Sequence, residues 1–210
     1  MTASLVTGVV WACGDAPADP PFTGTVVLAA PAAESAKGAG RRPGRAAAVP
    51  RRPPRPLPPS PAVRLAVPAL TIEAPVIQVG LDRLGHLGTP SLERPREVGW
   101  YRGGPTPGEA GTALIVGHRD TRTGPAIFLN LNALRPGDLV NIARADRRTA
   151  VFSVDAVKTY RKDKFPDREV YGRTGRPELR LLTCGGSFEK KTGYAANIVV
   201  FAHLTDVKRA

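Results

Sequence analysis

The feature that most limits the fold of this chain is a series of short apolar segments between residues 62 and 204, separated by glycine and proline. Several of these segments alternate apolar and polar residues, and others are brief apolar runs, both of which are typical of β-strands. No stretch has the length or period of a crossover helix, which argues against a parallel α/β sheet. The expected strands are residues 63–67, 72–79, 113–116, 138–143, 149–157, 178–184 and 197–204.

These segments predict an all-β fold of seven or eight strands. Closure of the sheet into a barrel would remove the exposed edges that short strands leave. Pro68 marks the strand before it as an edge strand, and the charged turn after residue 143 predicts a hairpin. A short helical period covers residues 124–134. Residues 158–177 are expected to form a long basic loop, and residues 185–196 a polar loop.

The N-terminal part of the chain has a different composition. Residues 14–61 are rich in alanine, proline, glycine and arginine, and the prolines prevent a helix or sheet from propagating. We therefore expect a disordered linker over residues 14–61, a folded domain over residues 62–205 and a tail over residues 206–210. The apolar run in residues 1–13 is too short to span a bilayer and is interpreted as the remnant of a signal or anchor segment. Cys13 ends a loose match to a lipoprotein cleavage site, and a frayed apolar tail is the alternative.

The chain is strongly basic, with a formal net charge of +12 and a pI of about 10.5. Such a surface favours polyanions, and nucleic acid, an anionic cell-wall polymer and lipid headgroups all fit this description. No nucleic-acid-binding motif accompanies the charge. We therefore expect no nucleic-acid partner and interpret most of the charge as an ordinary soluble surface.

Two residues at the ends of predicted buried strands are candidates for chemistry. Cys184 is followed by two glycines and is the only cysteine in the predicted domain. The strand would fix the direction of its side chain, while the glycines would allow a substrate carbonyl to approach. His118 ends the strand at residues 113–116 in the same way. The structural alternatives are a small core cysteine and an ordinary turn histidine.

Other kinds of site are not indicated by the sequence. The predicted domain has one cysteine and three scattered histidines without metal-ligand spacing, so no metal is expected. His86 is expected in a solvated turn, and His203 is expected to pack beside Phe201 in the last strand. No glycine-rich phosphate loop leads from a strand into a helix, so no nucleotide cofactor is expected either.

Several short motifs follow one another at a characteristic spacing. They are Gly99-Trp100-Tyr101, Pro107-Gly108, Gly117-His118-Arg119-Asp120-Thr121, Gly124-Pro125, Leu134-Arg135-Pro136-Gly137-Asp138 and Thr183-Cys184-Gly185-Gly186. In this order, with a polar loop and a terminal apolar strand after the cysteine, they resemble the sortase family. In detail they are similar to its actinobacterial class F branch, and the resemblance covers roughly residues 62–204.

The resemblance implies a closed eight-stranded β-barrel with one or two short helices, placed outside the membrane. It implies a cysteine transpeptidase that cleaves an LPXTG-like C-terminal sorting signal of secreted proteins through a thioester acyl-enzyme. The product would be transferred to an amine of the cell wall, such as a peptidoglycan precursor, without a cofactor. The protein would then be extracytoplasmic, with its N-terminus at the membrane surface.

The resemblance also implies roles for individual residues. Cys184 would be the nucleophile, His118 the acid and base, and Thr183 a residue that shapes the pocket. Sortases also place an arginine on the last strand, facing the cysteine, where this chain has Tyr194-Ala195-Ala196-Asn197. Asn197 is the candidate oxyanion donor, and the candidate cations for the missing charge are Arg102, Arg119, Arg180 and Lys191.

Because the arginine is missing, a second interpretation is a sortase-fold binding module with weak or no turnover. A third is a basic domain that binds cell-wall polymer or nucleic acid and in which the cysteine and histidine are incidental. Thioester formation would distinguish the first interpretation from both others.

Overall fold

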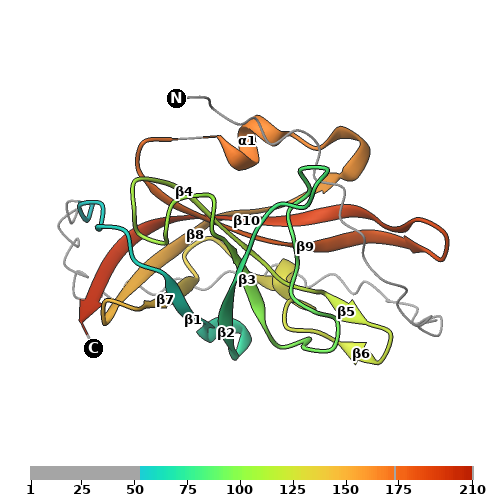
Figure 1. Cartoon of the computed structure of the whole chain (residues 1–210), viewed down its shortest axis with the longest axis horizontal. Coiled ribbons are helices and arrows are strands. Elements are labelled where there is room, and N and C mark those ends of the chain that lie inside the picture. Colours follow the sequence, from blue (N-terminus) through green and yellow to red (C-terminus); the bar gives the residue numbers. More distant parts are fainter. Residues whose placement is uncertain (1–52, 173, 210) are drawn as a thin grey trace, which may run out of the picture. The chain divides into compact units, whose positions relative to one another are not determined.

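The structure is a computed structural model that describes residues 53–172 and 174–209. Within these residues the strands form a closed eight-stranded barrel and a small two-stranded sheet (Figure 1). The barrel strands are β1 (Ala62–Val67), β2 (Ile72–Val79), β3 (Val98–Tyr101), β4 (Gly111–Val116), β7 (Leu139–Arg144), β8 (Arg148–Arg161), β9 (Pro177–Glu189) and β10 (Gly193–Arg209). The small sheet pairs β5 (Asp120–Thr121) with β6 (Gly124–Pro125). The helical elements are α1 (Asp167–Tyr171) and the 3-10 turns η1 (Pro68–Leu70), η2 (Leu131–Ala133) and η3 (Lys162–Lys164).

The barrel has the strand order β1-β2-β3-β4-β9-β10-β8-β7, and β7 pairs with β1 to close it. Most neighbours are antiparallel, but β2 pairs with β3 and β4 pairs with β9 in parallel. Parallel neighbours end at the same edge of a sheet. β4 and β9 therefore run in the same direction side by side, with Val116 opposite Leu182, although β5, β6, β7 and β8 separate them in the sequence.

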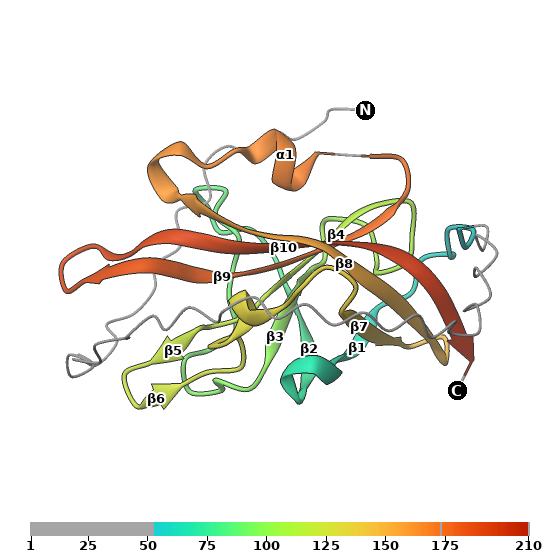
Figure 2. The same ribbon diagram turned by 180° about the vertical axis from the view of Figure 1, so that it is seen from behind.

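Strand alternation divides the apolar residues between the two faces of the barrel wall. On β9, Leu179 and Leu181 belong to the larger cluster, whose members come from all eight strands and fill the barrel. Leu182 and Cys184 belong to a second cluster on the opposite face. This outer cluster is covered by α1, whose Val170 is fully buried in it (Figure 2). The wall that carries Cys184 is therefore covered on both sides.

The first half of the barrel confirms part of the sequence prediction and corrects the rest. The predicted hairpin is the β7–β8 pair. The prediction that residues 63–67 form an edge strand is wrong, because β1 pairs with β2 on one side and with β7 on the other. The predicted helical period at residues 124–134 yields only β6 and η2. There, Ala126 and Phe128 donate backbone hydrogen bonds to the carbonyls of Arg119 and His118, so the segment follows the preceding turn instead of coiling.

Two predicted loops also contain regular structure. β8 continues to Arg161, and η3 and α1 occupy much of the predicted basic loop at residues 158–177. The predicted polar loop at residues 185–196 is a β-hairpin, because β9 runs on to Glu189 and β10 begins at Gly193. A Cβ atom on Gly185 would lie only 2.6 Å from Cγ1 of Ile198. This glycine therefore permits close pairing of the two strands and does not end β9.

Residues 53–61, which precede the first strand, are hydrogen-bonded to the domain. The amide of Leu57 donates to the carbonyl of Gly108 at 2.8 Å, and the amide of Ser60 donates to Oγ1 of Thr106 at 3.1 Å. Most of the linker predicted over residues 14–61, and the segment that contains Cys13, lie outside the described residues. Within the described residues, every helix is too short to serve as an apolar membrane span.

Candidate active site

The candidate site lies where the parallel strands β4 and β9 run side by side. Val116 is paired with Leu182, and the amide of Gly117 donates to the Leu182 carbonyl at 3.1 Å, which extends the ladder by one residue. His118 and Cys184 each lie two residues beyond that pair. The fold therefore places the two sequence-predicted residues on neighbouring segments, although sixty-six positions separate them in the chain.

His118 and Cys184 also share a face of the barrel wall. A Cβ atom on Gly117 would contact the ring of Phe128, a member of the interior cluster. Alternation along the extended segment then turns the next residue, His118, toward the outer face. Cys184 lies on that face with Val116 and Leu182.

One nitrogen of the His118 ring is held by the backbone of another loop. Nε2 lies 2.8 Å from the carbonyl oxygen of Pro90, and the side chain is buried. Because a carbonyl oxygen only accepts, Nε2 must carry a proton and donate it. Nδ1 is then the ring nitrogen that remains able to accept a proton.

Cys184 is buried within a β-strand and does not lie at its end. Its exposed fraction is 5%, and β9 continues for five residues beyond it. Cys184 is disulfide-bonded in this structure, and only its reduced thiol can act as a nucleophile. The rigid placement predicted from the sequence is therefore achieved by pairing with Asn197 of β10, while the pairing of β9 with β4 ends two residues earlier, at Leu182.

Asn197 lies directly opposite Cys184 in the antiparallel pair of β9 and β10. Directly opposed residues project to the same face, with Cβ atoms about 5 Å apart. The side chain is 1% exposed, and neither Oδ1 nor Nδ2 has a hydrogen-bond partner among the described residues. An unpaired buried amide is costly, so this side chain is available to a group that enters from the face of Cys184.

The other predicted cations do not share this position. Arg180 donates to Oε2 of Glu178 at 2.6 Å, and its guanidinium lies 4.4 Å from the centre of the Phe201 ring. It precedes Cys184 by four residues, which is about 13 Å along a strand. Lys191 lies in the turn between β9 and β10, and Arg102 lies against Gly80. The structure therefore brings none of these three beside Cys184.

Two further predicted residues are placed differently. Thr183 shares the interior face with Leu181, and its buried hydroxyl has no partner among the described residues. Arg119 follows His118 in the chain, and its guanidinium lies over the ring of Tyr194 at 5.5 Å. Of the predicted cations, Arg119 is therefore the one next to the histidine.

The sequence reasoning missed the support for Arg119. The hydroxyl of Tyr194 donates a hydrogen bond to Oδ2 of Asp120, and the same carboxylate oxygen lies 3.9 Å from Nε of Arg119. Burial, together with the Asp120 hydrogen bond, raises the pKa of Tyr194 to about 12. The phenol therefore stays protonated and fixes the residues that follow His118. The Gly-His-Arg-Asp-Thr motif contained this signal, but its partner on β10 is visible only in the fold.

A polar and aromatic cover lies over the same outer face. Nζ of Lys158 and the hydroxyl of Tyr160 both donate to Oε1 of Glu169 on α1, at 2.7 and 2.8 Å. Tyr160 also packs edge-on against Phe201, with ring centroids 6.4 Å apart. The hydroxyl of Tyr171 is buried without a partner among the described residues, and burial raises its pKa. The spaced aromatics of the predicted basic loop were the sequence signal for this cover.

Comparison with known proteins identifies the family. The family model for the sortase domain matches residues 65–205. The chain therefore belongs to the sortase family of cysteine transpeptidases. A comparison with curated protein sequences found no match.

Solved structures show the same fold at low sequence identity. Sortase C1 of Streptococcus agalactiae, in complex with MTSET, is 22% identical over 68% of each chain, with a TM-score of 0.53. Sortase C-1 from Actinomyces oris is 20% identical over 68% of this chain and 73% of that chain, with a TM-score of 0.54. Sortase A from Corynebacterium diphtheriae is 19% identical over 70% of this chain and 62% of that chain, with a TM-score of 0.55. The predicted eight-stranded sortase barrel is thus confirmed.

Proposed function

We propose that this protein is a class F-like transpeptidase. It would cleave LPXTG-like sorting signals and transfer the acyl group of the cleaved protein to an amine of the cell wall. The observation that carries the proposal is the parallel pairing of β4 with β9. It brings His118 and Cys184 together on one face, with Asn197 opposite the cysteine. A nucleophile, a proton carrier and a hydrogen-bond donor are the three groups that acyl transfer through a thioester needs.

The first half of the reaction forms the acyl-enzyme. His118 takes the proton of the Cys184 thiol, and the thiolate attacks the scissile carbonyl carbon. The tetrahedral intermediate collapses with formation of the thioester and loss of the C–N bond, while His118 returns the proton to the leaving amine. In the second half, an acceptor amine attacks the thioester carbonyl and loses a proton to His118. The new C–N bond forms, the C–S bond breaks, and the thiolate is regenerated.

Asn197 is the proposed donor to the oxyanion. Negative charge develops on the carbonyl oxygen when the thiolate attacks, and a donor fixed beside the nucleophile stabilises that charge. Nδ2 of Asn197 is buried, lacks a partner among the described residues and belongs to the residue opposite Cys184. Arg119, next to His118, is the proposed cation for the substrate backbone. Thr183, Arg180 and Lys191 are assigned supporting positions in the wall and the hairpin, away from the reacting carbonyl.

The proposal extends to the location and partners of the enzyme. The donors would be secreted proteins with an LPXTG-like C-terminal signal, and the acceptor a peptidoglycan precursor or another amine. Their meeting place is the outer surface of the cell, with the domain held at the membrane through residues 1–61.

The test is capture of the acyl-enzyme by mass spectrometry. The reduced wild-type protein, incubated with an LPXTG peptide, should gain the mass of the peptide fragment on Cys184, and hydroxylamine should release it. Cys184→Ala should show neither the adduct nor cleavage. Cleavage by Cys184→Ala at the wild-type rate would contradict the mechanism.

The absence of an arginine from the segment Tyr194-Ala195-Ala196-Asn197 supports one alternative, a sortase-fold binding module with weak or no turnover. The same experiment separates the two functions. Saturable peptide binding by the reduced wild-type protein without any adduct would favour the module.

A further inference from the structure

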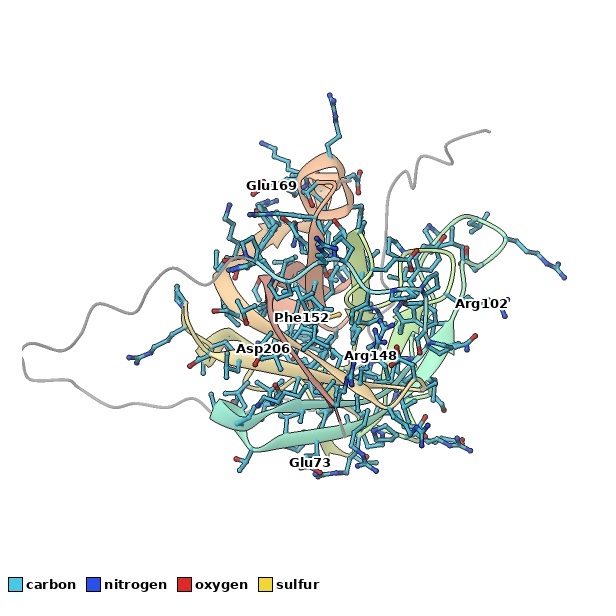
Figure 3. All side chains as sticks on the ribbon, turned by 90° about the vertical axis from the view of Figure 1, so that its left-hand side faces the viewer. Glu73, Arg102, Arg148, Phe152, Glu169 and Asp206 are labelled. Carbon is cyan, nitrogen blue, oxygen red and sulfur yellow. The ribbon has the colours of Figure 1, made fainter. Side chains whose placement is uncertain are left out.

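A cationic pocket lies at the opposite end of β8 and β10 from the candidate active site. It is an open pocket of about 310 Å³, lined by Asp146, Arg147, Arg148 and Arg209. Arg148 begins β8 and Arg209 ends β10, while Asn197 pairs with Tyr160 near the other end of β8. The two positions on β8 are separated by about 40 Å of strand. Figure 3 views the domain from the end with the pocket and labels Arg148.

The three arginines of this pocket lie close to one another. Arg209 lies directly opposite Arg148 in the antiparallel ladder, and Arg147 occupies the adjacent turn with a positive φ of 62°. Like charges that lie directly opposite each other across two strands destabilise a sheet. The arrangement therefore has an electrostatic cost that a bound anion would remove.

The single carboxylate in the pocket is already committed to other partners. Oδ1 and Oδ2 of Asp146 accept from Nε and Nη2 of the buried Arg144 at 3.3 and 3.1 Å, and Oδ1 also accepts from the amide of Arg148. Its distance to Nε of Arg148 is 4.0 Å. Asp146 thus offers one negative charge to both Arg144 and Arg148, and with Arg147 and Arg209 the pocket keeps an excess of positive charge for a ligand.

We propose that this pocket binds a phosphate group, and that the phosphate belongs to an anionic phospholipid headgroup. Arginine binds phosphate through paired N–H donors, and three arginines that share one open pocket suit a tetrahedral anion. The ordered N-terminal segment runs beside it, since Nη2 of Arg144 donates to the carbonyl of Pro58 at 2.6 Å. A segment that connects the domain to a membrane at this end would bring the pocket to the lipid surface.

This inference concerns a surface remote from Cys184 and holds whether or not the enzyme turns over. Binding here would orient the domain on the membrane, with the end that carries Cys184 directed away from the lipid. Loss of the pocket should therefore change membrane binding without changing cleavage of a soluble peptide.

The test compares two variants of equal net charge in the full chain. One removes the pocket by Arg147→Gln, Arg148→Gln and Arg209→Gln, and the control carries Arg83→Gln, Arg96→Gln and Arg135→Gln at exposed positions elsewhere. Co-sedimentation is measured with phosphatidylglycerol-containing vesicles and with neutral phosphatidylcholine vesicles. The shift in melting temperature is measured with glycerol phosphate, a soluble phosphate. Comparison of this shift with vesicle binding separates a site for lipid headgroups from a site for soluble phosphate alone.

The wild type and the control should bind the anionic vesicles within about threefold of each other, and the pocket variant at least about tenfold more weakly. Glycerol phosphate should raise the melting temperature of the wild type and not of the pocket variant. A thermal shift without vesicle binding would retain the phosphate site and overturn the lipid assignment. Equal weakening of both variants would show that net charge alone acts and would overturn the proposal.

Discussion

Arg144 and Asn197 are both almost fully buried polar side chains, one near each end of β8. Arg144 donates hydrogen bonds to the carbonyls of Pro107 and Pro58 and to Asp146. Asn197 has no partner for either side-chain atom among the described residues. A buried polar group with a full set of partners holds a structure together, whereas one without partners is available to a ligand. Arg144 therefore stabilises its end of the barrel, whereas Asn197 is placed to serve the proposed reaction at the other end.

The largest expected effect is on catalysis by His118. His118→Ala removes the proton carrier and should lower the rate of peptide cleavage by about a thousandfold. His203→Ala is the matched control, because His203 is paired with Asp155 at the surface through a 2.7 Å contact. Initial rates with a fluorogenic LPXTG peptide measure both variants. Comparable losses of cleavage rate in the two variants would contradict the role of His118 as the proton carrier.

Asn197 tests whether an unpaired buried amide serves the substrate. Asn197→Asp keeps the shape but removes the donor, and it should lower kcat by about a hundredfold or more. Asn141→Ala is the control, because Oδ1 of Asn141 on β7 is also buried without a partner in the described structure. If Asn197→Asp turned over like the wild type, the oxyanion donor would have to be another group.

Arg144 tests the structural side of the comparison. Arg144→Met leaves the carbonyls of Pro58 and Pro107 without their donor, removes both guanidinium bonds of Asp146, and should lower the free energy of unfolding by about 2–4 kcal/mol. Arg161→Met is the matched control, because Arg161 pairs with Asp163 at the same sequence spacing but on an exposed surface. Its cost should stay below about 1 kcal/mol. Chemical denaturation measures both, and peptide cleavage at a temperature where both variants are folded should match the wild type.

The smallest expected effect is the acid sensitivity of the same end. Hydrogen bonds from Arg144 hold the pKa of Asp146 below its ordinary value. The folded state therefore binds the proton less readily than the unfolded state, so the stabilisation is present above about pH 4 and lost as the pH falls further. Asp146→Asn should lack this part of the decline in unfolding free energy below pH 4. If the free energy of unfolding fell by the same amount in the wild type and in this variant between pH 5 and pH 3, the Asp146 carboxylate would contribute nothing to the acid sensitivity.

The sequence predicted the residues of the candidate site better than their surroundings. Cys184 and His118 follow apolar runs whose burial is a local property, so the pattern alone indicated both. Cys184 was nevertheless expected at the end of a strand, and β9 continues past it to Glu189. The two glycines that follow the cysteine indicated a break, because nothing local shows that Ile198 approaches Gly185 across the hairpin.

What the sequence determined by itself was the all-β class, the barrel implied by the family resemblance, and the choice of Cys184 and His118 as the candidate residues. The tertiary structure decided which strands are neighbours. Only the parallel pairing of β4 with β9 brings His118 to Cys184, and only the register of β10 places Asn197 opposite the cysteine while Arg180 is held by Glu178. The physical reason is that alternation along a strand is set by adjacent residues. Pairing, by contrast, depends on segments that are distant in the chain and meet when the barrel closes.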